Sequence, residues 1–107
     1  MNWKEAEKRA ANYLRRKGFK VLECNYRTRF GEIDIIARYG KYLVFVEVKS
    51  GQSVFSPRTR VDMKKLHHIQ LAANDYIMRN PQKCSGYRID VVEVTENGIE
   101  HFEDVQT

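Results

Sequence analysis

YLVFVEVK, residues Tyr42–Lys49, is the stretch that decides the fold of this 107-residue chain. Side chains of a β-strand alternate between its two faces, so Glu47 and Lys49 point the same way as Leu43 and Phe45. An acid and an amine thus interrupt an otherwise apolar face at the end of the strand. The pair is a candidate for catalysis, although an ordinary Glu-x-Lys salt bridge at a solvated edge has the same spacing.

The stretch just before it, Gly31–Ala37 (GEIDIIA), is expected to be a second strand that also carries an acid, Asp34. We expect alternation to place Ile33, Ile35 and Ala37 on one face, and Glu32, Asp34 and Ile36 on the other. The connection Arg38–Lys41 is short and contains a glycine, which predicts a β-hairpin. With residues 40 and 41 at the centre of the turn, Asp34 falls directly opposite Glu47, with Cβ atoms about 5 Å apart.

Two carboxylates at that distance repel each other unless a positive charge lies between them, and Mg²⁺ or Mn²⁺ would supply it. Asp34 and Glu47 are therefore candidate metal ligands, and the backbone carbonyl of Val48 is a candidate third. Such an ion polarises a phosphoryl oxygen and lowers the pKa of a bound water. Lys49 is then a candidate catalytic residue that orients or deprotonates the water and balances the charge on the pentavalent phosphate.

A helix is predicted between Asn2 and Gly18, because Asn2 and Glu5 have the spacing of a capping box and glycine ends helices. Its predicted buried stripe consists of Trp3, Ala6, Ala10 and Leu14. Glu7 lies in the same stripe, where an acid is costly unless it is paired or binds a ligand. It is a candidate catalytic residue that supports the site through a water or a second ion, although a Glu at the margin of the stripe can also reach solvent.

The remaining hydrophobic patterns predict a first strand over 19–26, a second helix from about Val61 to Arg79, and strands over 88–94 and 99–102. The inward face of the second helix is predicted to consist of Leu66, Ile69, Ala73, Tyr76 and Ile77. The resulting order, α-β-β-β-α-β-β, describes an α/β fold with a mixed sheet flanked by helices. We expect residues 1–107 to form a single domain.

The net charge of +5 and the pI near 9.3 favour a polyanionic partner such as DNA, because basic side chains that neutralise phosphates release counterions. The candidate phosphate contacts are Arg58, Arg60, Lys64 and Lys65. No apolar run approaches the ~20 residues that span a bilayer, and the N-terminus lacks the pattern of a signal peptide. With two cysteines, Cys24 and Cys84, interpreted as reduced thiols, we expect a cytoplasmic protein without membrane contact.

The combination of Gly31–Ala37 with Val44–Lys49 resembles the YraN-type family of small bacterial endonuclease-like proteins, and the likeness extends over nearly the whole chain. Glu7 matches the family's acid on the first helix, Lys65 fits its second helix, and Arg88–Val92 fits its late strand. The resemblance implies a restriction-endonuclease-like fold.

The same resemblance implies a PD-(D/E)xK nuclease motif, represented here by Asp34, Glu47 and Lys49. The pattern is also similar to that of archaeal Holliday junction resolvases, which are small dimeric nucleases with an acid on the first helix. In the YraN-type family an arginine often follows two positions after the lysine, whereas this chain has Gly51 there. A phosphate contact of the family is thereby removed.

The leading hypothesis is a Mg²⁺- or Mn²⁺-dependent DNA endonuclease, with branched or otherwise structured DNA as a candidate substrate. A chain of this length offers little surface to enclose a duplex, which is compatible with a homodimer. Two alternatives stay open at this point. One is a nucleic-acid-binding module of the same fold with little or no nuclease activity, and the other is a protein-interaction adaptor in which the acids are only structural.

Overall fold

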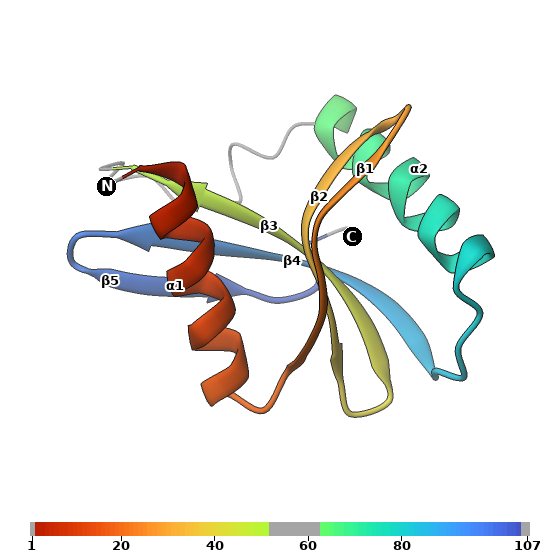
Figure 1. Cartoon of the computed structure of the whole chain (residues 1–107), viewed down its shortest axis with the longest axis horizontal. Coiled ribbons are helices and arrows are strands. Elements are labelled where there is room, and N and C mark those ends of the chain that lie inside the picture. Colours follow the sequence, from red (N-terminus) through yellow and green to blue (C-terminus); the bar gives the residue numbers. More distant parts are fainter. Residues whose placement is uncertain (1, 52–62, 106–107) are drawn as a thin grey trace.

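The computed structural model describes residues 2–51 and 63–105 of the chain (Figure 1). Its elements are α1 (Trp3–Arg16), β1 (Lys20–Thr28), β2 (Gly31–Tyr39), β3 (Tyr42–Ser50), α2 (Met63–Arg79), β4 (Gly86–Thr95) and β5 (Gly98–Phe102). The strands form one sheet in the order β1-β2-β3-β4-β5, in which β3 and β4 are parallel and the other neighbours antiparallel. The predicted mixed sheet with two helices is confirmed.

The first helix begins and ends where the sequence predicts. The Asn2 side chain accepts a hydrogen bond of 2.8 Å from the Glu5 backbone N–H, and Gly18 leaves the helix with φ +94°. The buried stripe contains Ala6, Ala10, Ala11 and Leu14, but the prediction for Trp3 is wrong, because its side chain is 43% exposed. Helical side chains lean towards the N-terminus, and Trp3 has no preceding turn to cover it.

The β2–β3 hairpin has the predicted register, with Tyr39 opposite Tyr42 and residues 40 and 41 in the turn. Its pairing ends at Ile35 opposite Val46, whereas β2 stays paired with β1 as far as Gly31. Figure 1 shows the β1–β2 hairpin rising away from β3 beyond this point and passing close to α2. We call the parting of β2 from β3, at Asp34 on one side and Glu47–Val48 on the other, the fork.

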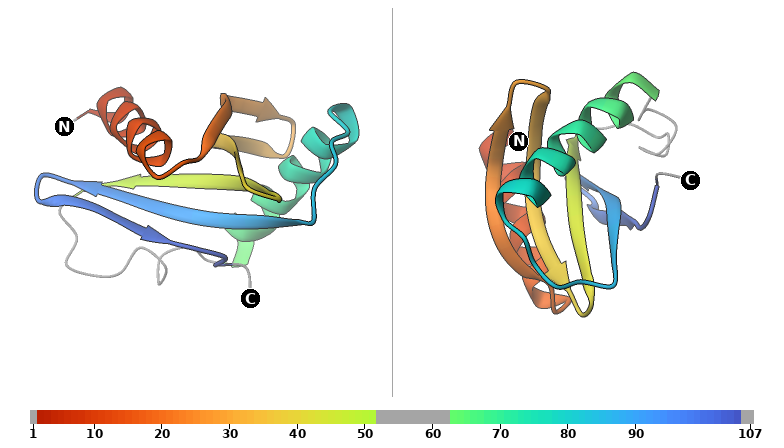
Figure 2. Two further views of the ribbon diagram at one scale, coloured as in Figure 1. Left: turned by 90° about the horizontal axis from the view of Figure 1, so that it is seen from below. Right: turned by 90° about the vertical axis from the view of Figure 1, so that its right-hand side faces the viewer.

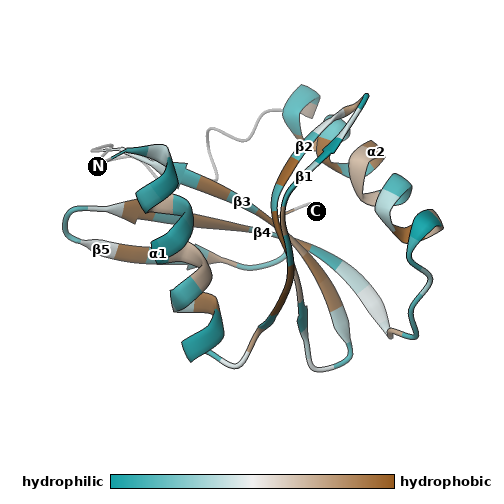
Figure 3. Ribbon diagram, viewed as in Figure 1, coloured by the Kyte–Doolittle hydropathy of each residue, from teal (hydrophilic) through white to brown (hydrophobic). Residues whose placement is uncertain are grey.

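Each helix covers its own face of the sheet (Figure 2). Helix α1 packs on the face of β3 that carries Val44, Val46 and Val48, and α2 packs on the face that carries Leu43 and Phe45. Figure 3 shows hydrophobic segments along β3 and β4 and hydrophilic colouring over much of α1. The alternation predicted for β3 is therefore correct.

The prediction for Ile33 is wrong, because this residue packs in the α2 cluster with Ile36 rather than in the α1 cluster with Ile35 and Ala37. The reason is the fork: beyond Ile35 the strand leaves the plane of β3 and follows β1 across α2.

The second helix is described from Met63, so the predicted start near Val61 lies outside the described residues. Its buried residues are Leu66, Ile69, Ala72, Ala73 and Tyr76, with Ile77 partly buried against them. Neither helix in the described part of the chain is long and apolar enough to cross a membrane.

A buried ionic cluster ties β4 and β5 to α1. Asp90 accepts two hydrogen bonds from Arg88, at 3.0 and 2.9 Å, and its Oδ2 lies 2.7 Å from His101 Nε2. His101 Nδ1 lies 3.2 Å from the Tyr13 hydroxyl on α1. Burial alone would raise the pKa of Asp90, but hydrogen bonds from His101, Arg88 and the Asp104 backbone N–H outweigh it and hold this pKa below its usual value.

Candidate active site

At the fork, the Asp34 side chain takes the place beside Val48 that the backbone of a paired strand would otherwise fill. Because β2 has left β3, the Val48 N–H finds no backbone carbonyl on β2 and donates instead to Oδ2 of Asp34, at 2.8 Å. The N–H and C=O of one strand residue point the same way, so the Val48 carbonyl also faces the fork. The Asp34 side chain is only 4% exposed.

Asp34 and Glu47 converge on each other, as the sequence predicts. Burial is the main cause that raises the pKa of Asp34, followed by a side-chain hydrogen bond with Glu47 and by the negative charge of Glu47. Two weaker effects act in opposite directions: the hydrogen bond from the Val48 N–H lowers the pKa of Asp34, and the charge of Glu7 raises it. The resulting pKa of Asp34 is about 8. Without a bound cation, the pair therefore holds one proton between two carboxyl groups at neutral pH.

Two lysines neutralise the charge of Glu47 from different elements. Lys49 Nζ, from the same strand, lies 3.8 Å from Glu47 Oε2, and Lys65 Nζ, from α2, lies 3.3 Å from the same oxygen. Lys49 thus reaches the site as predicted. Lys65, predicted as a phosphate contact, reaches the carboxylate itself, so the first turn of α2 belongs to the site.

Glu7 faces the site from α1. Its Oε2 atom is buried and makes no hydrogen bond to any residue in 2–51 or 63–105. A buried oxygen in this state costs free energy, on the order of 1–3 kcal/mol, unless a proton, a water or a cation satisfies it. Its charge also raises the pKa of Asp34, so the two carboxyl groups are electrostatically coupled.

These residues fit a hard divalent cation held by few protein ligands. Mg²⁺ is commonly bound by one or two carboxylates, with waters and substrate phosphate oxygens completing its coordination. Asp34, Glu47 and the Val48 carbonyl supply such a partial set at the fork. Among the described residues, no three His, Cys, Asp or Glu side chains lie close enough to hold one ion together, which leaves Glu7 for an outer position.

The structure describes only one of the other three residues that the sequence predicts as phosphate contacts. Lys64 is exposed on the first turn of α2, one residue before Lys65. Arg58 and Arg60 lie outside the described residues.

Sequence reasoning missed Asn25, which takes the left-handed conformation with φ 55° inside β1. It stands between Cys24 and Tyr26, which pair with Ile35 and Ile33, so it lies across β2 from the fork, level with Asp34. Asparagine is depleted in strands and tolerates this conformation, and its presence in a predicted strand is the signal that could have indicated an irregularity.

The sequence is similar to one family model and to several bacterial proteins. The model described as "Uncharacterised protein family UPF0102" matches residues 6–94. A UPF0102 protein of Pseudothermotoga lettingae is 74% identical over 106 residues, which cover 99% of each chain. One of Thermotoga maritima is 50% identical over 105 residues, covering 98% of this chain and 96% of that protein. One of Persephonella marina is 39% identical over 103 residues, covering 94% and 89%.

Proposed function

We propose a function for this chain, which belongs to the UPF0102 family: metal-dependent hydrolysis of phosphodiester bonds in DNA. In this proposal the fold is interpreted as restriction-endonuclease-like, with Asp34, Glu47 and Lys49 as its PD-(D/E)xK residues. Mg²⁺ or Mn²⁺ is the proposed cofactor. DNA as the partner, the homodimer and the cytoplasmic location stay predictions.

The observation that carries the proposal is the pair of carboxyl groups at the fork. A structural role for Asp34 and Glu47 would be met more cheaply by uncharged side chains, since burying two acids together forces one of them to keep a proton at neutral pH. Paired acids of this kind are typical of sites that bind cations or transfer protons. The neighbouring lysines and the overall charge of +5 favour a phosphate substrate.

The residues take separate roles in this mechanism. A bound divalent ion would supply Lewis-acid polarisation of the phosphoryl group and a water of lowered pKa. Asp34, Glu47 and the Val48 carbonyl would hold it in place. The Lys49 ammonium would orient the attacking water by hydrogen bonding and offset the negative charge that develops on the phosphoryl oxygens. Lys65 would keep Glu47 in position through the contact at 3.3 Å.

The test is cleavage of labelled linear duplex, single-stranded and four-way-junction DNA in Mn²⁺ and in EDTA. The wild type is compared with Asp34→Asn and with a matched control, Glu32→Gln. Glu32 is an acid of the same strand that pairs with Arg27 at the surface. We expect the wild type and the control to cut DNA only with metal, and Asp34→Asn to bind DNA without cutting it.

Other results would refute the proposal in distinct ways. Cleavage that persists in EDTA, or in Asp34→Asn, would mean that the activity does not come from this site. Salt-sensitive DNA binding by the wild type without cleavage in either metal would favour a binding module. Neither binding nor cleavage would leave the adaptor hypothesis.

A further inference from the structure

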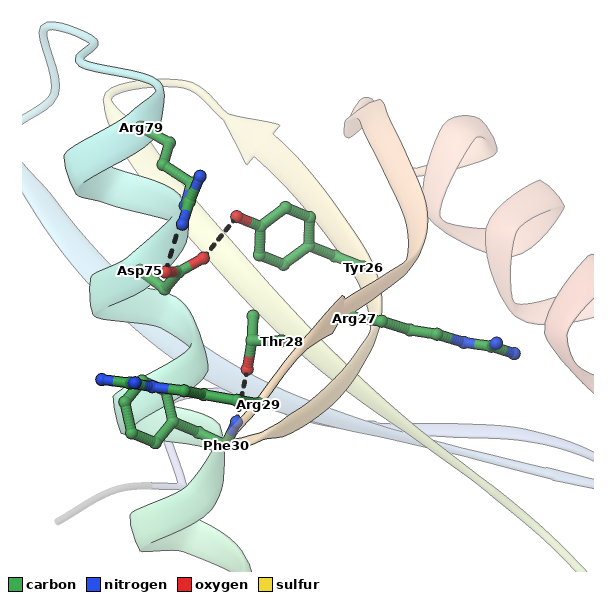
Figure 4. Close-up of a pocket in the computed structure, with 7 residues that line it drawn as sticks. All are labelled: Tyr26, Arg27, Thr28, Arg29, Phe30, Asp75 and Arg79. Carbon is green, nitrogen blue, oxygen red and sulfur yellow. Dashed lines mark hydrogen bonds and ion pairs between the residues drawn. The ribbon is translucent and has the colours of Figure 1, made fainter.

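A second feature of the molecule is a cavity of about 720 Å³ between the tip of the β1–β2 hairpin and the second half of α2 (Figure 4). It is lined by residues 26–30 of the hairpin and by Asp75 and Arg79 of α2. None of these residues has a role in the proposed hydrolysis. The volume lies in the range of sites that bind small molecules or single building blocks of a polymer, roughly 300–1,000 Å³.

The hairpin tip holds Arg29 and Phe30 in a defined turn. Thr28 pairs with Gly31 across the hairpin, which leaves Arg29 and Phe30 as the two turn residues. The Thr28 hydroxyl donates to the Gly31 carbonyl at 3.0 Å and accepts from the Phe30 N–H at 3.0 Å. Gly31 adopts φ +142°, which an L side chain would resist. The tip is thus fixed by its own short hydrogen bonds.

The side chains of Arg29 and Phe30 lie against each other at this tip, and we call this pair the platform. The guanidinium carbon of Arg29 lies 4.9 Å from the centroid of the Phe30 ring, and Figure 4 shows the Arg29 side chain lying across that ring. Arginine planes and aromatic rings are the surfaces on which proteins stack unpaired bases. The platform therefore combines a stacking surface with a positive charge.

The opposite wall supplies a second guanidinium. Asp75 accepts hydrogen bonds from the Tyr26 hydroxyl at 2.7 Å and from Arg79 Nε at 3.1 Å. The hydrogen bond from Tyr26 is the main cause that lowers the pKa of Asp75, and Arg29 lowers it further by its charge. Asp75 thus serves to fix Tyr26 and Arg79. The Arg79 side chain is 72% exposed, and only Nε takes part in its contact with Asp75.

Arg27 differs from these two arginines, although it belongs to the same hairpin. Figure 4 shows its side chain directed away from Arg29, Asp75 and Arg79. Its Nε lies 2.9 Å from Glu32 Oε1, and its side chain is 82% exposed. It therefore adds positive charge near the tip without facing the other lining residues.

From this arrangement we propose that the cavity binds one unpaired nucleotide of a nucleic acid strand. Arg29 and Arg79 contact its phosphate, and its base stacks on the platform of Arg29 and Phe30. A base within a duplex is stacked on both sides and cannot offer a face to such a platform. The proposal rests on the proposed hydrolysis of DNA and specifies its substrate class as strands with unpaired nucleotides beside the cut.

The position of the cavity agrees with this role. Phe30 is the turn residue directly before β2 and precedes Asp34 by four residues, a distance of about 13 Å at the rise of a strand. That distance equals about four base-pair steps of duplex DNA, at roughly 3.4 Å each. One nucleic acid strand can therefore reach both the fork and the cavity.

The test is fluorescence anisotropy with labelled single-stranded DNA and with blunt duplex DNA, in EDTA so that no cleavage interferes. Arg29→Ala and Phe30→Leu are compared with Arg27→Ala, which removes the same charge from the same hairpin. We expect Arg29→Ala and Phe30→Leu to weaken single-strand binding about tenfold, from the loss of one stacked base. Arg27→Ala and all duplex affinities should change by about twofold or less. Leucine retains the bulk of Phe30, and thermal denaturation checks that each variant folds.

The results separate this proposal from the proposed hydrolysis, since cleavage in Mn²⁺ is measured on the same proteins. The cavity proposal is overturned if Arg27→Ala and Arg29→Ala weaken binding equally, if Phe30→Leu binds like the wild type, or if the wild type does not bind single strands. If the wild type cuts DNA but the binding tests fail, only the proposed hydrolysis stands. If the expected binding pattern is found without cleavage, only the proposed nucleotide site stands.

Discussion

Replacing Asp34 by asparagine is expected to stabilise the metal-free protein and to abolish its response to metal. In the folded chain, burial and the neighbouring Glu47 raise the pKa of Asp34 from 3.8 to about 8. Below about pH 4 the folded and unfolded chains both hold this proton, so the buried Asp34 carboxyl does not yet lower the free energy of unfolding. Between about pH 4 and pH 8 only the folded chain keeps the proton, so the free energy of unfolding falls as the pH rises.

The magnitude follows from the size of this shift. One pKa unit corresponds to about 1.4 kcal/mol, so a rise from 3.8 to about 8 sets an upper bound of about 6 kcal/mol. Water that enters the fork as the proton leaves reduces this cost, and we expect about 2 kcal/mol at pH 8. The asparagine amide can accept from the Val48 N–H and donate to Glu47 without titrating. Asp34→Asn should therefore exceed the wild type in stability by about 2 kcal/mol at pH 8 and match it near pH 4.

The assay is urea denaturation followed by circular dichroism at several pH values between about 4 and 8, in EDTA and in Mn²⁺. With Mn²⁺ at about 100 times its dissociation constant, the wild type should gain about 2.7 kcal/mol and Asp34→Asn nothing. Glu32→Gln, which removes a surface acid from the same strand, should follow the wild type in every condition. The reasoning is refuted if Asp34→Asn is the less stable protein at pH 8, or if wild-type stability rises between pH 4 and pH 8.

Substitutions of three further residues, Lys49, Asn25 and Asp90, test other parts of the molecule. Lys49→Ala should lose metal-dependent cleavage, while its affinity for DNA in EDTA should stay within about twofold of that of the wild type. Cleavage by this variant at the wild-type rate would exclude the proposed role of Lys49. In urea denaturation, Asn25→Ala should lower the free energy of unfolding by about 1–2 kcal/mol, because alanine resists φ 55°. Asn25→Gly should lower it less, and equal losses in the two variants would contradict this explanation. Asp90→Ala should cost about 3–5 kcal/mol, because Arg88 and His101 lose their buried carboxylate partner and Arg88 keeps only the exposed Glu103. Glu100→Ala on β5 should change the stability little, and similar effects of the two substitutions in urea denaturation would disprove the point.

Local rules account for the parts of the fold and site that the sequence predicts correctly. Strand alternation placed Glu47 and Lys49 on one face, and the length of the connection gave the correct register as far as Ile35 opposite Val46, one residue short of the predicted pairing of Asp34 with Glu47. Asn2 and Gly18 marked the ends of α1 because caps depend on nearby residues. Each of these inferences needs only a few neighbouring positions in the chain.

The features that sequence reasoning missed depend on contacts between distant segments. Ile33 changes cluster because β2 leaves β3 and packs over α2, which no pattern within β2 indicates. Lys65 reaches Glu47 only because α2 is packed against the sheet at that end. The platform of Arg29 and Phe30 becomes a cavity wall only when Asp75 and Arg79 stand opposite it.

The hydrogen bond between Val48 and Asp34 makes one backbone amide a spectroscopic probe of the fork. An amide proton that points at a carboxylate oxygen changes its magnetic resonance frequency when that oxygen gains or loses charge. The Val48 N–H lies 2.8 Å from Oδ2 of Asp34, so its resonance should follow the protonation of this side chain and its occupation by a cation. A pH or metal titration of the ¹⁵N-labelled protein would then measure both events at a single atom, with no substrate present.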